Sequence, residues 1–121
     1  PAEAQLQGPV DAAAQVPVEQ REDGRPLYAI GGVRVRAVKL DTWAMADGQD
    51  DYAFVHAALK IGAGRSEAAR QRTGDALFDL MKRHFAALYE RRYLALSLEI
   101  GEFSEAGTWK HNNVHAKFKK N

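Results

Sequence analysis

The residues of this chain that could do chemistry are an N-terminal proline and three arginines. Pro1 opens the sequence, and a terminal amine is a weaker base than lysine, with a reference pKa of about 7.7–8.0. An apolar pocket with cations nearby would lower that pKa further. The proline ring also restricts the backbone at its nitrogen, so the lone pair of the amine keeps one direction. A neutral Pro1 amine could therefore accept a proton near neutral pH.

Two of the arginines, Arg34 and Arg36, lie in the alternating stretch "GGVRVRAVKL". Residues two apart on a strand share a face, and an arginine on a buried face needs an anionic partner. Salt bridges within the chain or between subunits would meet that need. A small molecule with carboxylates, bound by these arginines together with Arg65, would meet it as well.

The third arginine, Arg65, lies in "KIGAGRS", a glycine-rich turn between an expected strand and an expected helix. Backbone N–H groups and the positive end of a helix dipole meet at such a turn, and Ser66 is a suitable N-cap. The spacing is neither that of a P-loop nor that of a dinucleotide-binding turn. On shape alone, a tight turn with a solvated arginine is the commoner explanation.

Other kinds of site are not favoured. His111 and His115 have the four-residue spacing of a helical metal pair, but they lie in the turn-like "HNNVH" without an obvious third ligand, so we expect no metal site. The chain has no cysteine, which excludes disulfide and thiolate chemistry.

Composition narrows the class of protein. The chain has 121 residues, 17 Lys and Arg against 16 Asp and Glu, and a net charge of +1. This length suits one domain over residues 1–121, and the near-neutral charge gives no reason to expect nucleic acid or a membrane as partner. No apolar run is long enough to span a bilayer. We expect a cytoplasmic, soluble protein.

The elements that would position these residues are clearest in the second half. The patterns predict a strand over Asp51–Ile61, a helix over Glu67–Tyr89 and a strand over Tyr93–Ile100, which form a βαβ unit with parallel strands. The first half could be a degraded copy, with strands over residues 1–7 and 31–40 and a helix over 9–20. The expected fold is α+β, a four-stranded mixed sheet with helices on one face. Subunits packing together would cover the other face.

Four stretches of the sequence resemble a known family. "DTWAMADGQDDYAFVHAALKIGAGRS", "HFAAL", "LALSLEI" and "NNVHAKFK" are similar to the 5-carboxymethyl-2-hydroxymuconate isomerases. These enzymes belong to the tautomerase superfamily, alongside 4-oxalocrotonate tautomerase and macrophage migration inhibitory factor. The resemblance covers roughly Pro26 to Lys119.

The resemblance implies a fold, an assembly and a reaction. It implies two βαβ units and a homotrimer with active sites near subunit contacts. The reaction is a 1,3-proton shift, without a cofactor, in an unsaturated keto/enol polycarboxylate formed in homoprotocatechuate degradation. Pro1 would be the proton shuttle, and Arg34, Arg36 and Arg65 would bind the substrate carboxylates.

The first 25 residues share little of this resemblance beyond Pro1. A catalytically silent trimeric binding protein with a tautomerase fold is therefore the alternative. Nucleic-acid binding through the C-terminal lysines is a third possibility, and the net charge argues against it.

Overall fold

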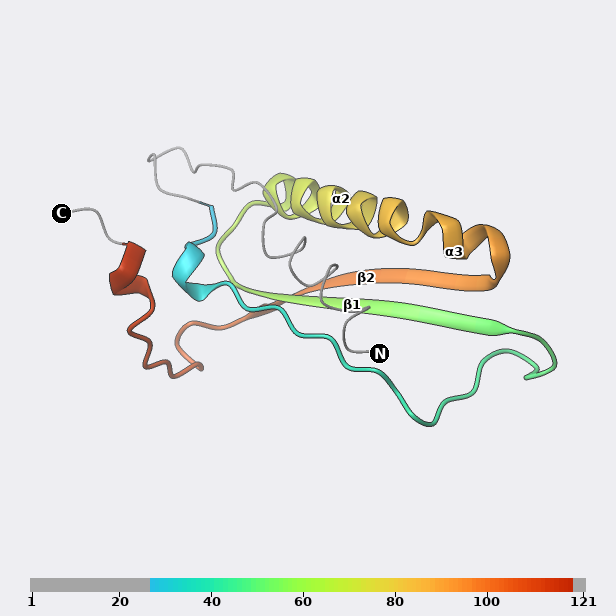
Figure 1. Cartoon of the computed structure of the whole chain (residues 1–121). Coiled ribbons are helices and arrows are strands. Elements are labelled where there is room, and N and C mark those ends of the chain that lie inside the picture. Colours follow the sequence, from blue (N-terminus) through green and yellow to red (C-terminus); the bar gives the residue numbers. More distant parts are fainter. Residues whose placement is uncertain (1–26, 119–121) are drawn as a thin grey trace. The chain divides into compact units, whose positions relative to one another are not determined.

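A strand–helix–strand unit forms the larger part of the computed structural model, which describes residues 27–118. Its elements are β1 (Tyr52–Gly62), α2 (Glu67–His84), α3 (Ala86–Arg91) and β2 (Tyr93–Phe103) (Figure 1). They belong to a compact unit of residues 38–108, and residues 27–37 and 109–118 belong to a second unit. Pro1 and the elements expected over residues 1–7 and 9–20 lie outside the described residues.

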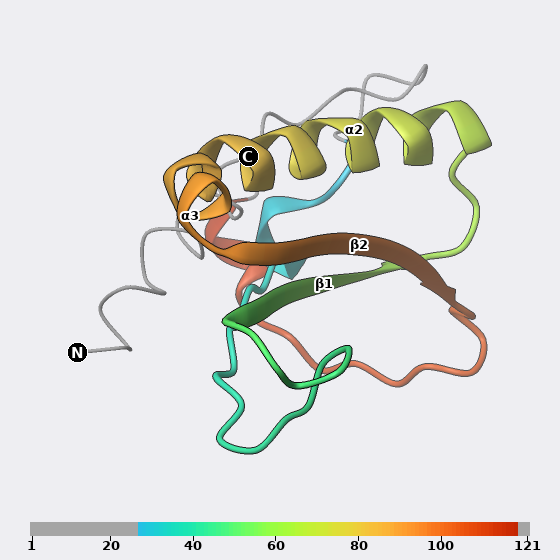
Figure 2. The ribbon, with the colours of Figure 1, turned by 90° about the vertical axis from the view of Figure 1, so that its right-hand side faces the viewer.

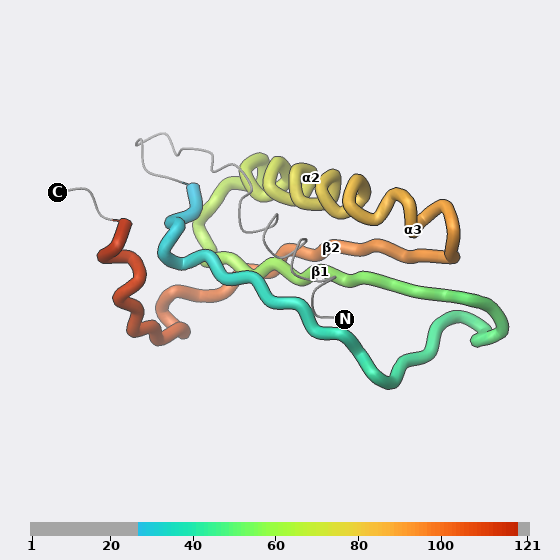
Figure 3. Tube along the Cα trace, viewed as in Figure 1, coloured from blue at the N-terminus to red at the C-terminus, as the bar shows by residue number. Residues whose placement is uncertain are grey.

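The two strands run parallel and pair in register from Tyr52 opposite Tyr93 to Gly62 opposite Phe103. The Cα trace in Figure 3 follows this parallel course. A parallel pair needs a crossover connection, and α2 with α3 supplies it. The predicted βαβ unit is confirmed, and the second strand continues three residues beyond its expected end at Ile100.

Both helices lie on one face of the strand pair (Figure 2). A Cβ added at Gly74 of α2 would meet Ile100 Cδ1 at 3.4 Å, so the helix approaches β2 closely there. Ile61, Ala69 and Leu94 are buried between these layers. The alternation of each strand thus turns its apolar set toward α2, as expected.

The helical segment is interrupted at Phe85, where one helix over Glu67–Tyr89 was expected. Phe85 has φ −97° and ψ 12°, outside the range of a regular helix. Its N–H still donates to Met81 O at 3.0 Å, and its own carbonyl accepts from Tyr89 N at 2.9 Å. The chain therefore changes direction without losing these helical hydrogen bonds, and the apolar periodicity gives no sign of the break.

The opposite face of the strand pair, which we call the open face, carries a mixed set of side chains. Phe54 and Tyr93 are exposed on it, and the Phe54 ring packs edge-on against Trp43 with centroids 5.5 Å apart. At its centre His56 and Ser97 are in register and both exposed.

The second unit pairs two short 3-10 helices, η1 (Ile30–Gly32) and η2 (His115–Phe118). Asn112 Nδ2 donates to Gly31 O at 3.0 Å. A Cβ at Gly31 would come within 2.7 Å of His115 Cα, so only glycine allows this approach.

The strand expected over residues 31–40 is not observed, and this prediction is corrected. The segment begins with η1, and residues 33–40 belong to no helix or strand. Val33 is extended, with φ −78° and ψ 124°. An extended segment becomes a strand only when another strand supplies its ladder hydrogen bonds, and the only paired strands among residues 27–118 are β1 and β2. The described part is thus a small α+β fold with two of the four expected strands.

Within residues 27–118, no helix combines the length and the apolar composition that crossing a bilayer requires.

Candidate functional site

The turn between β1 and α2 is built from residues 62–66 and carries Arg65. Gly64 has φ +117°, a conformation that side chains rarely adopt, so glycine is required there. Ala63 N donates to Phe103 O at 3.0 Å, which ties the start of the turn to the end of β2.

Ser66 ends the turn and caps α2. Its backbone is extended, with φ −67° and ψ 157°, and its Oγ accepts a hydrogen bond from Ala69 N at 3.1 Å. The predicted N-cap is confirmed. The dipole of this 18-residue helix places about half a positive charge at its N-terminus, next to the turn.

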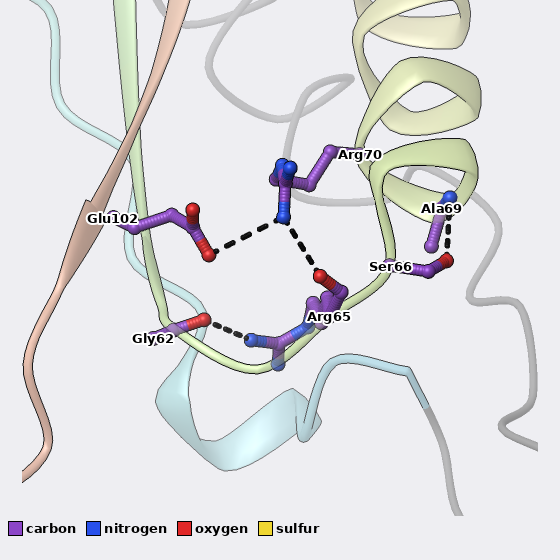
Figure 4. Close-up of polar contacts among 6 residues, drawn as sticks. All are labelled: Gly62, Arg65, Ser66, Ala69, Arg70 and Glu102. Atoms are coloured by element: carbon purple, nitrogen blue, oxygen red, sulfur yellow. Dashed lines mark hydrogen bonds and ion pairs between the residues drawn. The ribbon is translucent and has the colours of Figure 1, made fainter.

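Arg65 is half-buried and folds back over the turn (Figure 4). Its Nη1 donates to Gly62 O at 2.9 Å. The guanidinium therefore has a defined orientation, and its charge adds to that of the helix N-terminus. A planar guanidinium at such a place is suited to bind a carboxylate.

Two residues that were not predicted from the sequence, Arg70 and Glu102, hold this turn in place. Arg70 Nη1 donates to Arg65 O at 2.7 Å and lies 3.5 Å from Glu102 Oε2. Helical side chains point toward the helix N-terminus, so an arginine four residues after an N-cap can reach the preceding turn. That spacing was the available signal for Arg70. Glu102 could not be found in the same way, since the strand was expected to end at Ile100.

Arg34 and Arg36 are both exposed in the extended segment after η1. They belong to the second unit, whereas Arg65 belongs to the first. The expected convergence of these three arginines and Pro1 stays a prediction.

The two histidines considered as metal ligands lie near η2. His115 begins that helix and packs against Gly31. Across residues 27–118, no group of three His, Asp or Glu side chains is arranged to hold a metal ion.

A second polar cluster lies on the open face. His56 Nδ1 is 2.6 Å from Ser97 Oγ, and His56 Nε2 is 3.2 Å from Glu99 Oε1. Both ring nitrogens of His56 therefore have hydrogen-bond partners, and these partners hold the imidazole ring in one orientation. No role was predicted for these residues from the sequence, because their contact depends on the strand register.

A third polar group orders the loop before β1. Asp47 Oδ1 accepts from Gln49 N at 3.0 Å and from Tyr52 Oη at 2.8 Å. The Gln49 N–H and then the Tyr52 hydroxyl lower the pKa of Asp47, and the Asp47 carboxylate in turn raises the pKa of Tyr52.

Comparisons with known proteins agree with the fold. The family model described as 5-carboxymethyl-2-hydroxymuconate isomerase matches residues 2–118. A 5-carboxymethyl-2-hydroxymuconate Delta-isomerase of Escherichia coli is 57% identical over 93 residues, which cover 77% of this chain and 74% of that protein.

Two solved structures of 5-carboxymethyl-2-hydroxymuconate isomerases are also similar to this chain. A 5-carboxymethyl-2-hydroxymuconate isomerase from Deinococcus radiodurans R1 has a TM-score of 0.78 and 45% identity, covering 98% of this chain and 84% of the other. A second structure, a 5-carboxymethyl-2-hydroxymuconate delta-isomerase, has a TM-score of 0.79 and 31% identity. The match covers 100% of this chain and 84% of the other.

The fold and its similarity to these solved structures thus define a small α+β protein of the isomerase class. The chain belongs to the 5-carboxymethyl-2-hydroxymuconate isomerase family. The resemblance seen in the sequence, and the expectation of an isomerase, are both confirmed.

Proposed function

We propose that this chain isomerises 5-carboxymethyl-2-hydroxymuconate by a 1,3-proton shift that needs no cofactor. The neutral Pro1 amine removes a proton from a carbon next to a carbonyl and returns it two carbons away. The family match and the name of the Escherichia coli relative support the substrate. A related unsaturated keto/enol polycarboxylate would present the same carboxylates and the same acidic carbon.

The observation that carries this proposal is the arrangement around Arg65. A half-buried guanidinium is oriented by Gly62 O at the positive end of α2. Here it binds a substrate carboxylate and stabilises the negative charge that develops on the dienolate when the proton leaves.

Arg34 and Arg36 complete the proposed binding site. Both are exposed and so accessible to a ligand, and they bind further carboxylates of the substrate. Cations close to Pro1 also disfavour its protonated form, which lowers the pKa of the amine.

The proposed assembly is a homotrimer of single domains over residues 1–121, each with a four-stranded sheet, in the cytoplasm. The exposed aromatic residues Phe54 and Tyr93 on the open face support an assembly that covers this face. Active sites lie near the contacts between subunits.

Turnover of 5-carboxymethyl-2-hydroxymuconate by the wild-type chain and by a Pro1→Ala variant tests the proposal. We expect the variant to lose about 10²–10⁴-fold in kcat, the usual contribution of a general base. Equal turnover by the two proteins would refute a requirement for the secondary amine of the Pro1 ring. Binding of the substrate without turnover by either protein would instead identify a silent binding protein.

A further inference from the structure

We propose that Arg70 is a positioning residue for Arg65. The inference rests on the proposed role of Arg65 in binding a substrate carboxylate. One atom, Arg70 Nη1, donates to Arg65 O at 2.7 Å and lies 3.5 Å from Glu102 Oε2. Figure 4 shows that these contacts join the turn, α2 and β2.

The contact with Arg65 O fixes the peptide from which the arginine side chain begins. The guanidinium at the other end of that side chain donates to Gly62 O at 2.9 Å. Arginine loses much rotamer freedom when it is ordered. Because both ends of Arg65 are held before substrate arrives, less of that cost falls on the binding step.

The contact with Glu102 has a second consequence, which is electrostatic. Glu102 brings a negative charge close to the turn, where it would repel the substrate carboxylate that Arg65 is proposed to bind. The positive charge of Arg70 offsets this repulsion. The two side chains are 31% and 35% exposed, so solvent screens their attraction. The shorter hydrogen bond to Arg65 O therefore accounts for most of the expected effect.

Steady-state kinetics of Arg70→Met on 5-carboxymethyl-2-hydroxymuconate tests this role. Methionine keeps an unbranched side chain in contact with the helix surface but has no N–H donor. We expect KM to rise about three- to tenfold and kcat to fall by less than KM rises, because a displaced Arg65 weakens carboxylate binding and only partly weakens the stabilisation of the dienolate charge. Arg70→Lys retains a cationic donor and should restore most of the wild-type KM.

Arg83 offers a matched control at the other end of the same helix. Its Nε pairs with Asp79 Oδ2 at 3.0 Å, and the side chain is 70% exposed. Arg83→Met also removes a guanidinium and an ion pair of α2, and it should leave KM and kcat unchanged.

A double-mutant cycle separates positioning of Arg65 from a general structural effect. In an Arg65→Met background, Arg70→Met should raise KM no further, since there is no guanidinium left to position. Multiplicative effects of the two substitutions, or a wild-type KM for Arg70→Met, would overturn the inference. Thermal unfolding of each variant verifies the fold, and an unstable Arg70→Met is replaced by Arg70→Leu, which also has no N–H donor, under the same criteria.

The Arg65→Met variant alone separates this inference from the proposed function. A wild-type KM for Arg65→Met would refute the proposed role of Arg65, and the inference would fall with it. A raised KM for Arg65→Met with a wild-type KM for Arg70→Met would refute the inference alone.

Discussion

The side chain of Arg65 shows how much of a site a short motif contains. "KIGAGRS" indicated a turn, a helix start and a cation, and the structure has all three. The direction of the guanidinium was not predictable, because it depends on Gly62 O and on Arg70, which reaches back from α2. A motif shows which residue types are adjacent in the sequence. The orientation of a side chain depends on residues that are adjacent in space.

The charge of another single residue, Asp47, should make the contribution of the loop before β1 to stability depend on pH. Because its folded-state pKa is lowered, its contribution to stability is present above the usual carboxyl pKa of about 3.9 and is lost as the pH falls through the lowered value. Asp47→Asn keeps an acceptor oxygen but removes the charge.

We expect Asp47→Asn to be less stable than the wild type at about pH 7, and the difference to be smaller at about pH 3. Urea unfolding at both values measures this. Tyr52→Phe removes one donor to the carboxylate, so it should weaken the pH dependence. A destabilisation of equal size at both pH values would show that the charge has no part in it.

At the scale of elements, β1, α2 and β2 were predictable because their patterns are local. Strand alternation and helical periodicity place apolar residues on one side, and α2 covers that side in the structure. The break at Phe85 and the missing strand over residues 31–40 were not predictable in this way. A strand needs a partner, and the pattern of "GGVRVRAVKL" contains no information about one.

The start of α2 depends on one side chain, Ser66, whose Oγ accepts from Ala69 N. Ser66→Ala leaves this N–H without its protein acceptor, so we expect a loss of about 1 kcal/mol in the free energy of unfolding. Urea unfolding with a fixed m-value measures it. Ser66→Asp can accept the same hydrogen bond and should retain most of the stability. An unchanged midpoint for Ser66→Ala would contradict the importance of this cap.

At the scale of the whole molecule, the proposed assembly would cover the open face. Phe54 and Tyr93 are exposed there, and Ala58 lies on the same face of β1. The native mass in solution should correspond to three copies of the 13.4 kDa chain.

An added charge on the open face should disrupt this assembly. We expect Ala58→Lys to reduce the native mass, whereas Ala87→Lys, at an exposed position of α3, should not. A wild-type chain that is monomeric at assay concentrations would contradict the proposed trimer. An unaffected Ala58→Lys would contradict an interface on the open face.

The free secondary amine of Pro1 is the proposed catalytic base, and an N-terminal extension of the chain is the sharpest test of this role. A Pro1→Ala variant still has a terminal amine, whereas one alanine added before Pro1 keeps the ring and converts the amine into an amide. An amide nitrogen is not a base near neutral pH. We expect the extended chain to lose about 10²–10⁴-fold in kcat on 5-carboxymethyl-2-hydroxymuconate. Wild-type turnover by the extended chain, verified by intact mass, would exclude the Pro1 amine as the base.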